Sequence, residues 1–582
     1  MDKKQLETMR HSCSHVLASA VLKLYPKAKF GIGPAIENGF YYDFEFPASP
    51  AGGEKPIEEK DLAKISASMN QFIEAKLPFE KQEITIQQAK KIFKDQPYKL
   101  ELIEELAKEG NKKVTTYQVG EFLDLCQGPH LKNTCEIGPF KLISLAGAYW
   151  RGSEKNKMLT RIYGTCFPTE KELNDYLKIL EEVKKRDHRK IGPQMELFLF
   201  HETAPGMPYW LPKGLIILNE LVNFWRAEHS KRGYQEIKSP LINKQKLYET
   251  SGHWEHFQEH MFLSQTEEGE IYALKPMNCP NAMVVFDSKT HSYRDLPLRL
   301  SDTDTLHRYE KSGTLNGLFR VREFSQDDTH IFISEEQVKD EYQEILKITE
   351  LFYSIFNLSY SFRLGTRPEK FMGDKKSWDK AENELKEILE KSGKSFTILE
   401  GDGAFYGPKI DILMNDSLGR EWQMGTIQLD FYMPKRFNLK FTDKDGKEKI
   451  PVVIHRVIYG SLERFMGILI EHLAGAFPVW LSPVQAIVIP ITDKQNGYGQ
   501  KIVDRLREKN IRVELDNRSE TTSAKIRDAE LQKIPYLLVV GDKEIKENGV
   551  NVRVRGEKVL GLMNLGKFLA LIQEDIDKKR QV

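Results

Sequence analysis

Arginine and carboxyl side chains gather in one stretch of the sequence, residues 275–331. Arg308 and Glu310 follow a run of strand-forming residues, and a strand would present two residues at this spacing on one face. A glycine-containing loop then leads to Arg320. Converging guanidinium groups suit phosphate oxygens, because each is always charged and binds in a planar fork. The same pattern also fits a surface hairpin with solvated ion pairs, and this stretch alone leaves both interpretations open.

A second candidate anion site lies further along the chain. Strand-forming residues end at His455, and Gly460 and Ser461 then open an apolar helix that carries Arg464 in its first turn. The N-terminus of a helix attracts anions through its free N–H groups and its dipole. The two stretches together therefore favour a phosphate-binding site.

Another constellation near the N-terminus combines imidazole, thiol and carboxyl groups: His11, His15, Asp124, Cys126 and His130. The first two lie four residues apart on an amphipathic helix predicted over residues 6–24, so they share a face. The other three follow an apolar strand, and Gly128-Pro129 predicts a tight turn that directs the last histidine back. Such a set fits a metal site, a hydrolytic pocket or a packed turn, and spacing alone does not choose among them.

Composition limits the classes of protein that fit. The chain has 582 residues, enough for three or four domains, and a formal net charge of +1, which leaves nucleic acid as a partner if a basic surface is local. Apolar runs of membrane length and a signal peptide are not found, so we expect no membrane partner. Five cysteines without a paired framework predict free thiols and a cytoplasmic location.

The pattern of elements predicts a multidomain α+β protein. A first domain over residues 1–168 contains a helical insertion at about 55–110 in which we identify no chemistry. A linker helix follows over 169–191, and its His188 is predicted to be a surface histidine. Strands mixed with helices over 192–482 predict an antiparallel sheet flanked by helices, and regular alternation over 483–582 predicts an α/β domain with a mixed sheet.

These segments together resemble a known family. An upstream helix at 213–231 with a strand ending at Pro240, the Arg308 stretch and the Arg464 helix resemble the three signature motifs of class II aminoacyl-tRNA synthetases. The match is closest to the bacterial-type threonyl-tRNA synthetase family and extends over essentially the whole chain. The segments HSCSH and DLCQGPH resemble the paired editing motifs of that family, which alanyl-type enzymes share. The resemblance implies an editing domain, a class II catalytic domain and a C-terminal anticodon-binding domain.

The resemblance also implies an activity. Threonine would be activated with ATP to threonyl-adenylate and transferred to the 3′ end of threonine tRNA, and mischarged seryl-tRNA would be hydrolysed in the editing domain. The implied partners are threonine tRNA, ATP, L-threonine and a second copy of the chain, which would form a homodimer through the first motif, whereas DNA is not expected. The implied cofactors are Mg²⁺ with ATP and one Zn²⁺ per subunit.

Zinc is implied by the family and not by spacing. Cys279 lies between Pro276 and Pro280, which predicts a turn, and it forms no local ligand pair with His330 or His455. In the family, residues at these three positions hold one Zn²⁺ with an open coordination position. A hydrophobic pocket separates threonine from the nearly isosteric valine by only about a hundredfold, whereas an open zinc ion selects the hydroxyl group. Serine would pass this filter, and the editing pocket would remove it.

The remaining site residues follow from the resemblance. ATP and adenylate are expected at Arg308, Glu310, Arg320, Gln423 and Arg464. The threonine pocket is expected to include Gln326, Asp328, Tyr406, Lys409, Gln428 and His253. The editing site is expected at His11, His15, Asp124, Cys126 and His130, without a second zinc. Anticodon contacts are expected at Asn517, Glu544 and Arg553.

Two features depart from the family. Most bacterial relatives carry a ubiquitin-like domain before the editing domain, and we expect this protein to lack it. Asn281-Ala282 stands where the family has Gly-His, which leaves the local loop geometry open. Two alternatives are another class IIa synthetase, such as a prolyl or seryl enzyme, and a non-catalytic RNA-binding or regulatory paralogue. Such paralogues often lose motif arginines, whereas Arg308, Arg320 and Arg464 are all present.

Overall fold

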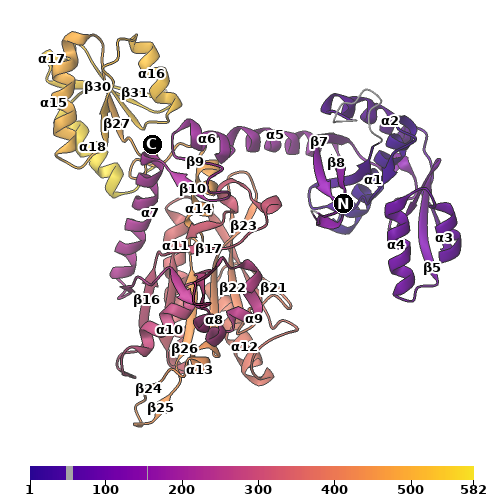
Figure 1. Ribbon diagram of the computed structural model, residues 1–582. Coiled ribbons are helices and arrows are strands. Elements are labelled where there is room, and N and C mark those ends of the chain that lie inside the picture. Colours follow the sequence, from indigo (N-terminus) through magenta and orange to yellow (C-terminus); the bar gives the residue numbers. More distant parts are fainter. Residues whose placement is uncertain (47–56, 154, 557) are drawn as a thin grey trace. The chain divides into compact units, whose positions relative to one another are not determined.

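The computed structural model describes residues 1–46, 57–153, 155–556 and 558–582. The chain divides into two compact units, Met1–Glu181 and Glu182–Val582 (Figure 1). Each unit has its own sheets and its own apolar core. Among the described residues, no helix is long and apolar enough to cross a membrane.

The first unit begins with helix α1 (Lys3–Leu24), which confirms the predicted amphipathic helix. Its buried face includes Val16, Leu17 and Val21, which pack in one core with aromatic residues of the neighbouring sheet such as Phe40. That sheet has five strands, in the order β1 (Lys29–Phe30), β3 (Gly39–Glu45), β8 (Met158–Cys166) and β7 (Phe140–Tyr149), with β2 (Ala35–Ile36) paired to β3. Burial of this helix face places His11 and His15 beside the core.

The predicted helical insertion is not helical throughout. It contains α2 (Leu62–Glu74), α3 (Ile86–Ile92) and α4 (Pro97–Lys108), but also strand β4 (Glu80–Thr85); residues 55 and 56 lie outside the described residues. Strand β4 pairs with β5 (Lys113–Val119), which pairs with β6 (Phe122–Leu125). Its side chains are mostly exposed and charged, as suits an edge strand, so no apolar pattern marks it in the sequence.

The predicted linker helix is broken into α5 (Glu170–Arg186) and α6 (His188–Gln194). Asp187 lies between them, and its side chain caps α6 by accepting a hydrogen bond from the N–H of Arg189 at 2.8 Å. The expectation of a surface His188 is wrong, because the residue is 0% exposed. Its imidazole lies against the buried carboxylate of Glu471, a partner too distant in sequence to be foreseen.

The second unit is built on an eight-stranded sheet, which confirms the predicted antiparallel architecture. Its strands, in spatial order, are β11 (Gln235–Glu236), β16 (Leu298–Asp302), β19 (Asp328–Ile333), β26 (Val452–Val457), β23 (Glu421–Asp430), β22 (Lys409–Asn415), β20 (Ser359–Gly365) and β21 (Phe396–Leu399). The six central strands are antiparallel, and only the two edge strands pair in parallel with their neighbours.

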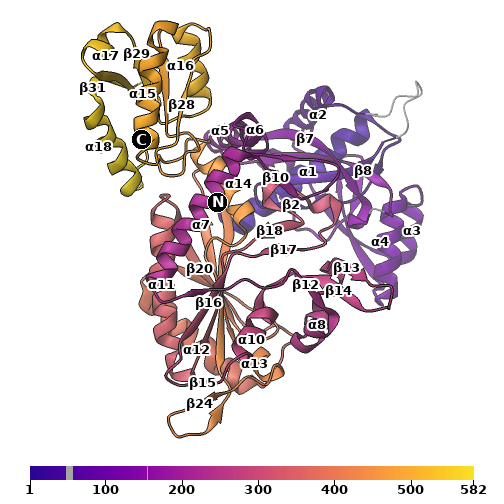
Figure 2. The same ribbon diagram turned by 60° about the vertical axis from the view of Figure 1, so that its left-hand side comes forward.

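The two faces of this sheet have different partners. The core on one face includes Ile331, Ile454 and Ile427 from the sheet, and helices α7 (Pro212–Ser230), α11 (Val338–Ser354), α12 (Lys375–Ser392) and α14 (Leu462–Leu473) contribute to the same cluster. Figure 2 shows α7, α11 and α12 on one side of the strands and α8 (Gln245–Ser251) and α10 (Cys279–Asp287) on the other. The second face is therefore available for a site.

Short elements complete this part of the second unit. They are helices α9 (His253–Phe257) and α13 (Met433–Arg436) and the strand sets β9 (Phe198–Phe200) with β10 (Pro208–Trp210), β17 (Thr305–His307) with β18 (Glu323–Ser325), β12 (Ile242–Lys244) with β14 (Ile271–Leu274) and β13 (Leu263–Gln265), and β15 (His291–Ser292) with β24 (Phe441–Thr442) and β25 (Glu448–Lys449).

The C-terminal part of the second unit confirms the predicted α/β pattern with a mixed sheet. Strands β28 (Val513–Leu515), β27 (Ala486–Pro490) and β29 (Tyr536–Val540) are parallel, and β30 (Gly549–Val554) and β31 (Lys558–Asn564) complete the sheet in antiparallel order. The helices of this part are α15 (Asn496–Arg507), α16 (Thr522–Leu531), α17 (Asp542–Lys546) and α18 (Leu565–Asp577).

Two helical glycines give a matched test of this packing. A Cβ on Gly214 in α7 would lie 1.9 Å from the carbonyl oxygen of Leu197, whereas a Cβ on Gly497 in α15 would meet no atom within 4 Å. We expect Gly214→Ala to destabilise the fold by about 1–3 kcal/mol, because backbone must move. We expect Gly497→Ala to leave stability unchanged or raise it by about 0.4–1 kcal/mol, because it restricts the unfolded chain. Calorimetry on both variants measures this, and equal effects would contradict the close approach of α7 to Leu197.

Candidate functional site

One row of side chains crosses the central strands on the open face. His330 of β19 is paired with His455 of β26, His455 with Gln428 of β23, and Gln428 with Lys409 of β22. Directly paired residues of antiparallel strands point to the same side of a sheet. The register therefore brings together residues that lie far apart in the sequence.

Cys279 joins the two histidines from outside the sheet. It is the first residue of α10, so the turn predicted there is the beginning of a helix, with Pro280 in a first-turn position that proline favours. The Sγ of Cys279 and a ring nitrogen of each histidine all lie within 4.8 Å of one another. All three residues are buried. One thiol and two imidazoles form a donor set that suits zinc.

Neighbouring groups complete this cluster. The Nε2 of His455 lies 3.0 Å from Oδ2 of Asp430, which fixes the ring orientation. The Nδ1 of His330 is buried and has no hydrogen-bond partner among the described residues. Burial lowers the pKa of His330 well below its usual value and raises the pKa of the Cys279 thiol. The imidazole of His330 is therefore neutral, the form that can ligate a cation.

A cavity of about 630 Å³ opens beside this cluster. All the residues predicted for zinc, ATP and threonine line it except Lys409 and His253. These lining residues are Cys279, Arg308, Glu310, Arg320, Gln326, Asp328, His330, Tyr406, Gln423, Gln428, His455 and Arg464. The structure thus brings residues from three separate stretches of the chain to one space.

Arg308 lies in the loop that follows β17, which ends at His307, so the strand predicted through Arg308 and Glu310 stops earlier. The guanidinium of Arg308 is held between the rings of Phe257 and Phe324, at 5.5 and 5.1 Å from their centroids. Its Nε donates to the carbonyl of Pro276 at 3.2 Å. These contacts hold the cation at the cavity with donors still available.

Arg320 and Arg464 reach the cavity from different elements. Arg320 forms an ion pair with Glu310 at 2.8 Å. Arg464 lies in α14, whose N-cap Ser461 accepts a hydrogen bond from the N–H of Arg464 at 3.2 Å, which confirms the predicted helix start. Burial lowers the pKa of Arg464, and the nearby charge of Arg320 adds to this effect. Two cations that face one cavity favour an anion between them.

A buried carboxylate joins the strand of the second motif to the turn before α14. The run predicted as one strand over 324–332 is broken at Asp327, between β18 and β19. The side chain of Asp327 accepts hydrogen bonds from the N–H groups of Ile458 and Gly460. The sequence gives no signal for this role, because the partners of Asp327 are backbone groups of a distant turn.

The predicted threonine residues lie on two sides of the cavity. The hydroxyl of Tyr406 donates to Oε1 of Gln428, and the Nδ2 of Asn278 donates to Oδ2 of Asp328 at 3.3 Å. Burial raises the pKa of Asp328. Gln326 lies at the break before β19 and forms an isolated bridge with Ser461. The cavity wall is therefore polar beside the Cys279 cluster.

Lys409 and His253 lie behind the cavity wall. The Nζ of Lys409 is 3.0 Å from Asp402 and 3.2 Å from Asp411, so its charge is already compensated. His253 is buried, with Nδ1 2.8 Å from the hydroxyl of Ser251 and Nε2 3.7 Å from the Sγ of Cys279. Lys409 therefore contacts two carboxylates of the neighbouring segments, and His253 contacts the candidate metal ligand Cys279.

The five residues of the N-terminal constellation also converge. The ring centroids of His11, His15 and His130 lie within 4.1–5.2 Å of one another. The Sγ of Cys126 is 3.4 Å from Nε2 of His11 and 3.3 Å from Nε2 of His130. Asp124 reaches the same pocket, 3.5 Å from Nε2 of His15. One nitrogen of each imidazole and the Sγ of Cys126 all lie within 4.8 Å of one another, a spacing that a metal site also requires.

Two residues of this pocket are not indicated by the sequence. Lys99, at the start of α4, is 2% exposed and forms an ion pair with Asp124. Tyr42 of β3 donates a hydrogen bond to Oδ2 of Asp124 at 2.7 Å and lies 3.2 Å from the Nζ of Lys99. The insertion in which no chemistry was identified therefore contributes a buried cation. In the sequence, the one indication of this cation is that Lys99 stands among the apolar residues of the buried face of α4.

Burial sets the protonation of this pocket. It lowers the pKa of His11, His15 and His130, so all three are neutral at physiological pH. Burial also raises the pKa of Cys126 to about 11, so the thiol is protonated. Neutral imidazoles can orient a water molecule by accepting or donating hydrogen bonds, whereas a protonated thiol is a weak nucleophile.

The predicted anticodon residues lie in a loop, a helix and a strand. Asn517 is exposed after β28, and Arg553 lies half-buried on β30. Glu544 lies in α17 and is 7% exposed. Its Oε2 accepts a hydrogen bond from the N–H of Gly541 at 2.9 Å, so part of its hydrogen-bonding capacity is used within the helix cap.

Comparisons with family models cover all three regions. Residues 262–473 match the class II core domain of tRNA synthetases for G, H, P, S and T, and residues 485–575 match an anticodon-binding domain. Residues 114–163 match the second additional domain of threonyl and alanyl tRNA synthetases. These matches agree with the class II sheet and with the separate pocket of the first unit.

Comparisons with individual proteins extend over nearly the full chain. The chain is 51% identical to a threonine–tRNA ligase of Thermotoga maritima, over 99% of this chain and 89% of the relative. It is also 51% identical to a threonine–tRNA ligase of Clostridium tetani, with the same coverage. A solved threonyl-tRNA synthetase structure from Cryptosporidium parvum superposes with a TM-score of 0.65 at 41% identity, over 67% of this chain and 98% of that chain. The chain therefore belongs to the threonyl-tRNA synthetases, the threonine–tRNA ligases of class II, and carries the editing domain of that family.

Proposed function

We propose that the 630 Å³ cavity binds ATP and threonine together and that each predicted residue acts from the place described above. The observation that supports this most is the convergence of Arg308, Arg320 and Arg464 on the cavity that the Cys279 cluster also lines. Phosphate and amino-acid sites must be adjacent for an adenylate to form. This arrangement also separates the protein from non-catalytic paralogues that have lost the arginines.

In the first step, a carboxylate oxygen of threonine attacks the α-phosphorus of ATP. The bond to the bridging oxygen breaks, and pyrophosphate leaves with Mg²⁺. Charge develops on phosphate oxygens, so fixed cations contribute more than proton transfer does. In our proposal Arg308 binds the α-phosphate, Arg320 and Arg464 bind the outer phosphates, and Glu310 and Gln423 orient the nucleotide. A ribose hydroxyl of the tRNA end then attacks the acyl carbon, and AMP leaves.

We propose that Cys279, His330 and His455 hold the zinc ion. The donor set fits, and the unpartnered Nδ1 of His330 and the Asp430 partner of His455 support this. When bound, zinc would offer an open position that selects an amino acid with both an amino group and a hydroxyl group. Valine has no hydroxyl group and would be rejected. Asp328 and Gln326 would hold the amine, and Tyr406 with Gln428 would close the pocket. His253 would support Cys279, and Lys409 would anchor the neighbouring strand.

We propose that the N-terminal pocket hydrolyses seryl-tRNA with water as the nucleophile and without a second zinc. The neutral imidazoles of His11, His15 and His130 support a role in binding and orienting that water by hydrogen bonds. The protonated thiol of Cys126 favours binding over attack. Lys99 and Tyr42 would fix the carboxylate of Asp124, which in turn would hold His15.

Three further proposals concern partners and location. A homodimer through the first motif is supported by exposed apolar residues in it and beside it, namely Leu215, Tyr209 and Ile242, and light scattering on the purified chain measures it directly. Contacts of Asn517, Glu544 and Arg553 with the anticodon are supported best by the exposure of Asn517. A cytoplasmic location is supported by the five free thiols.

The arginine assignment predicts a specific kinetic loss. Arg464→Ala should lower kcat/KM for ATP in threonine-dependent ATP–pyrophosphate exchange by roughly 100- to 1000-fold, because a preorganised charge is lost. Arg294 is exposed on the same unit and outside the cavity, so Arg294→Ala should stay within about twofold of the wild type. A normal Arg464→Ala enzyme would contradict the assignment of this cavity to ATP.

The zinc assignment predicts the metal content of single variants. The purified wild-type protein should contain about one zinc per chain by mass spectrometry of metals. Cys279→Ser should lose most of it and should lose threonine activation, because a thiolate ligand is replaced by a weak one. Cys135 is exposed, so Cys135→Ser is the matched control and should keep its zinc.

A further variant separates one zinc site from two. His130→Ala removes a potential ligand of the N-terminal pocket and should leave the zinc content unchanged. Zinc lost in His130→Ala would overturn the assignment of that pocket to a metal-free hydrolysis. Zinc retained in Cys279→Ser would overturn the assignment of the catalytic cluster.

The role of the N-terminal pocket predicts a selective loss of proofreading. Lys99→Met should lower hydrolysis of seryl-tRNA by roughly 100-fold or more, because Asp124 and His15 lose their fixed positions. Lys94 is exposed just before α4, so Lys94→Met is the control. Both variants should charge threonine tRNA with threonine normally. Unimpaired hydrolysis in Lys99→Met would show that this lysine only stabilises the fold.

A further inference from the structure

His188 is a buried histidine outside both sites that uses both of its ring nitrogens. The N–H of Leu318 donates to its Nε2 at 3.0 Å, so Nε2 carries no proton. Its Nδ1 therefore carries the proton and donates to Oε1 of Glu471 at 2.7 Å. The backbone N–H of His188 donates to the same oxygen at 3.1 Å. Because both nitrogens are engaged, the group of Asp187, His188 and Glu471 is not arranged to bind a metal.

The short turn η6 (Gly317–Phe319) is shaped around this imidazole. Gly317 has a φ of +50°, and a Cβ on it would lie 2.3 Å from Nε2 of His188. The ring of Phe319 lies 4.2 Å from the imidazole, and Leu318 is 0% exposed. A side chain at position 317 or a different ring at position 188 would therefore displace the turn.

This turn leads directly into Arg320. The N–H of Asn316 donates to the carbonyl of Arg320 at 3.2 Å, which closes a loop around the turn. Phe319 and Arg320 both line the 630 Å³ cavity. A displacement of the turn would therefore move a cavity wall and a cation together.

Glu471 also connects His188 to the surroundings of Arg464. Its second oxygen lies 2.7 Å from Arg420, whose guanidinium lies 5.1 Å from the ring of Trp422. Trp422 also lies beside Phe319, at 4.6 Å between ring centroids, and beside Arg464, whose guanidinium is 5.5 Å from the ring. Glu471 therefore links two groups of residues. One is His188 with the turn that precedes Arg320, and the other is Arg420 with Trp422, which lies beside Arg464.

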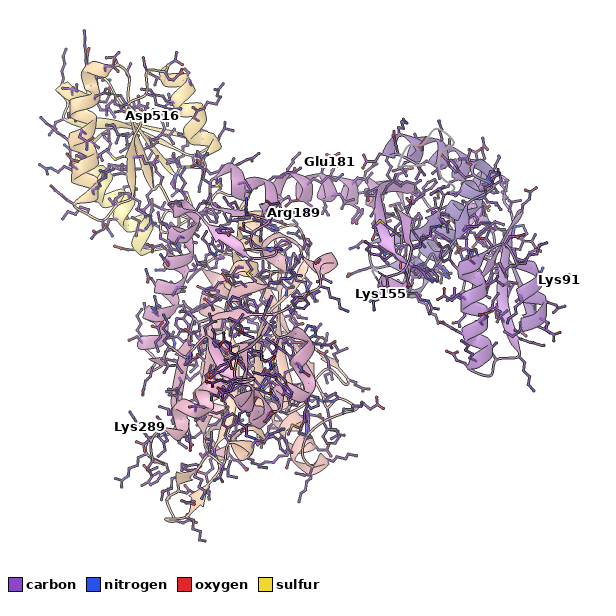
Figure 3. The ribbon with its side chains drawn as sticks, viewed as in Figure 1. Lys91, Lys155, Glu181, Arg189, Lys289 and Asp516 are labelled. Carbon is purple, nitrogen blue, oxygen red and sulfur yellow. The ribbon has the colours of Figure 1, made fainter. Side chains whose placement is uncertain are left out.

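We propose that His188 is a positioning residue for the ATP site, which sets the turn 316–320 against α14 so that Arg320 and Arg464 face the same phosphates. The proposal rests on the assignment of these two arginines to ATP. His188 itself is not among the residues that line the cavity. It is the first residue of α6, next to Arg189, which Figure 3 labels at that end of the linker.

Two amide substitutions separate the two hydrogen bonds of the ring. Glutamine at position 188 can place its amide oxygen where Nε2 lies and accept from Leu318. Asparagine can place its amide nitrogen where Nδ1 lies and donate to Glu471, but cannot reach Leu318. We expect His188→Asn to lower kcat/KM for ATP in pyrophosphate exchange by about 10- to 100-fold, mainly through a higher KM for ATP. We expect His188→Gln to recover most of this loss.

Other measurements on the same intact proteins exclude a general folding defect. Zinc content, KM for threonine and hydrolysis of preformed seryl-tRNA should match the wild type in both variants. Lys190→Ala, an exposed neighbour in α6, should be normal in every assay. Equal losses in His188→Asn and His188→Gln, or a loss that affects threonine and ATP alike, would overturn the positioning role.

Arg464→Ala measured in parallel separates this proposal from the one on which it rests. If Arg464→Ala raises the KM for ATP and His188→Asn does not, the ATP site stands and the role of His188 is wrong. If Arg464→Ala leaves ATP kinetics unchanged, the assignment of the cavity itself is wrong, and the role of His188 falls with it.

Discussion

The catalytic centre depends on the register of three antiparallel strands. Pairing of His330 with His455 and of His455 with Gln428 aligns two imidazoles and one amide in a single row. A shift of one residue in either pairing would turn one partner toward the helical core on the other face. That face is filled by residues such as Ile331 and Ile454, so the apolar packing and the site select the same register. The position of the candidate metal ligands is thus a consequence of how the sheet buries its isoleucines.

Burial has a second role that both sites share. It keeps the imidazoles of His15 in the N-terminal pocket and of His330 beside Cys279 neutral, because it makes their charged forms unfavourable. A neutral ring can orient a water molecule in the first pocket and can ligate a cation in the second. The difference between the sites lies in the neighbouring charges: the Lys99–Asp124 pair in one, and Asp430 beside an open cavity in the other. One physical effect therefore prepares two different reactions.

The sequence predicts the major elements and most of the site, for identifiable reasons. Apolar periodicity marks α1, α7 and α14, and the family motifs carry Arg308, Arg320 and Arg464 to one cavity. Residues that act through distant or backbone partners leave no such pattern. Asp327 binds the N–H groups of a turn, Lys99 lies in a charged insertion, and His188 lies in a polar segment although its partner Glu471 is buried. Strand β4 is missed because an exposed edge strand has no alternation of apolar residues.

The position of β26 in the sheet has a consequence for the growing chain. This strand lies between β19 and β23 in space but follows both in sequence, so the central place in the sheet is filled late. The editing unit, Met1–Glu181, precedes all of it. At a synthesis rate of about 5–20 residues/s, the stretch of about 280 residues that separates the end of that unit from Arg464 takes roughly 15–60 s to emerge. During translation, the unit that hydrolyses mischarged tRNA can therefore fold before the sheet that supports aminoacylation is complete.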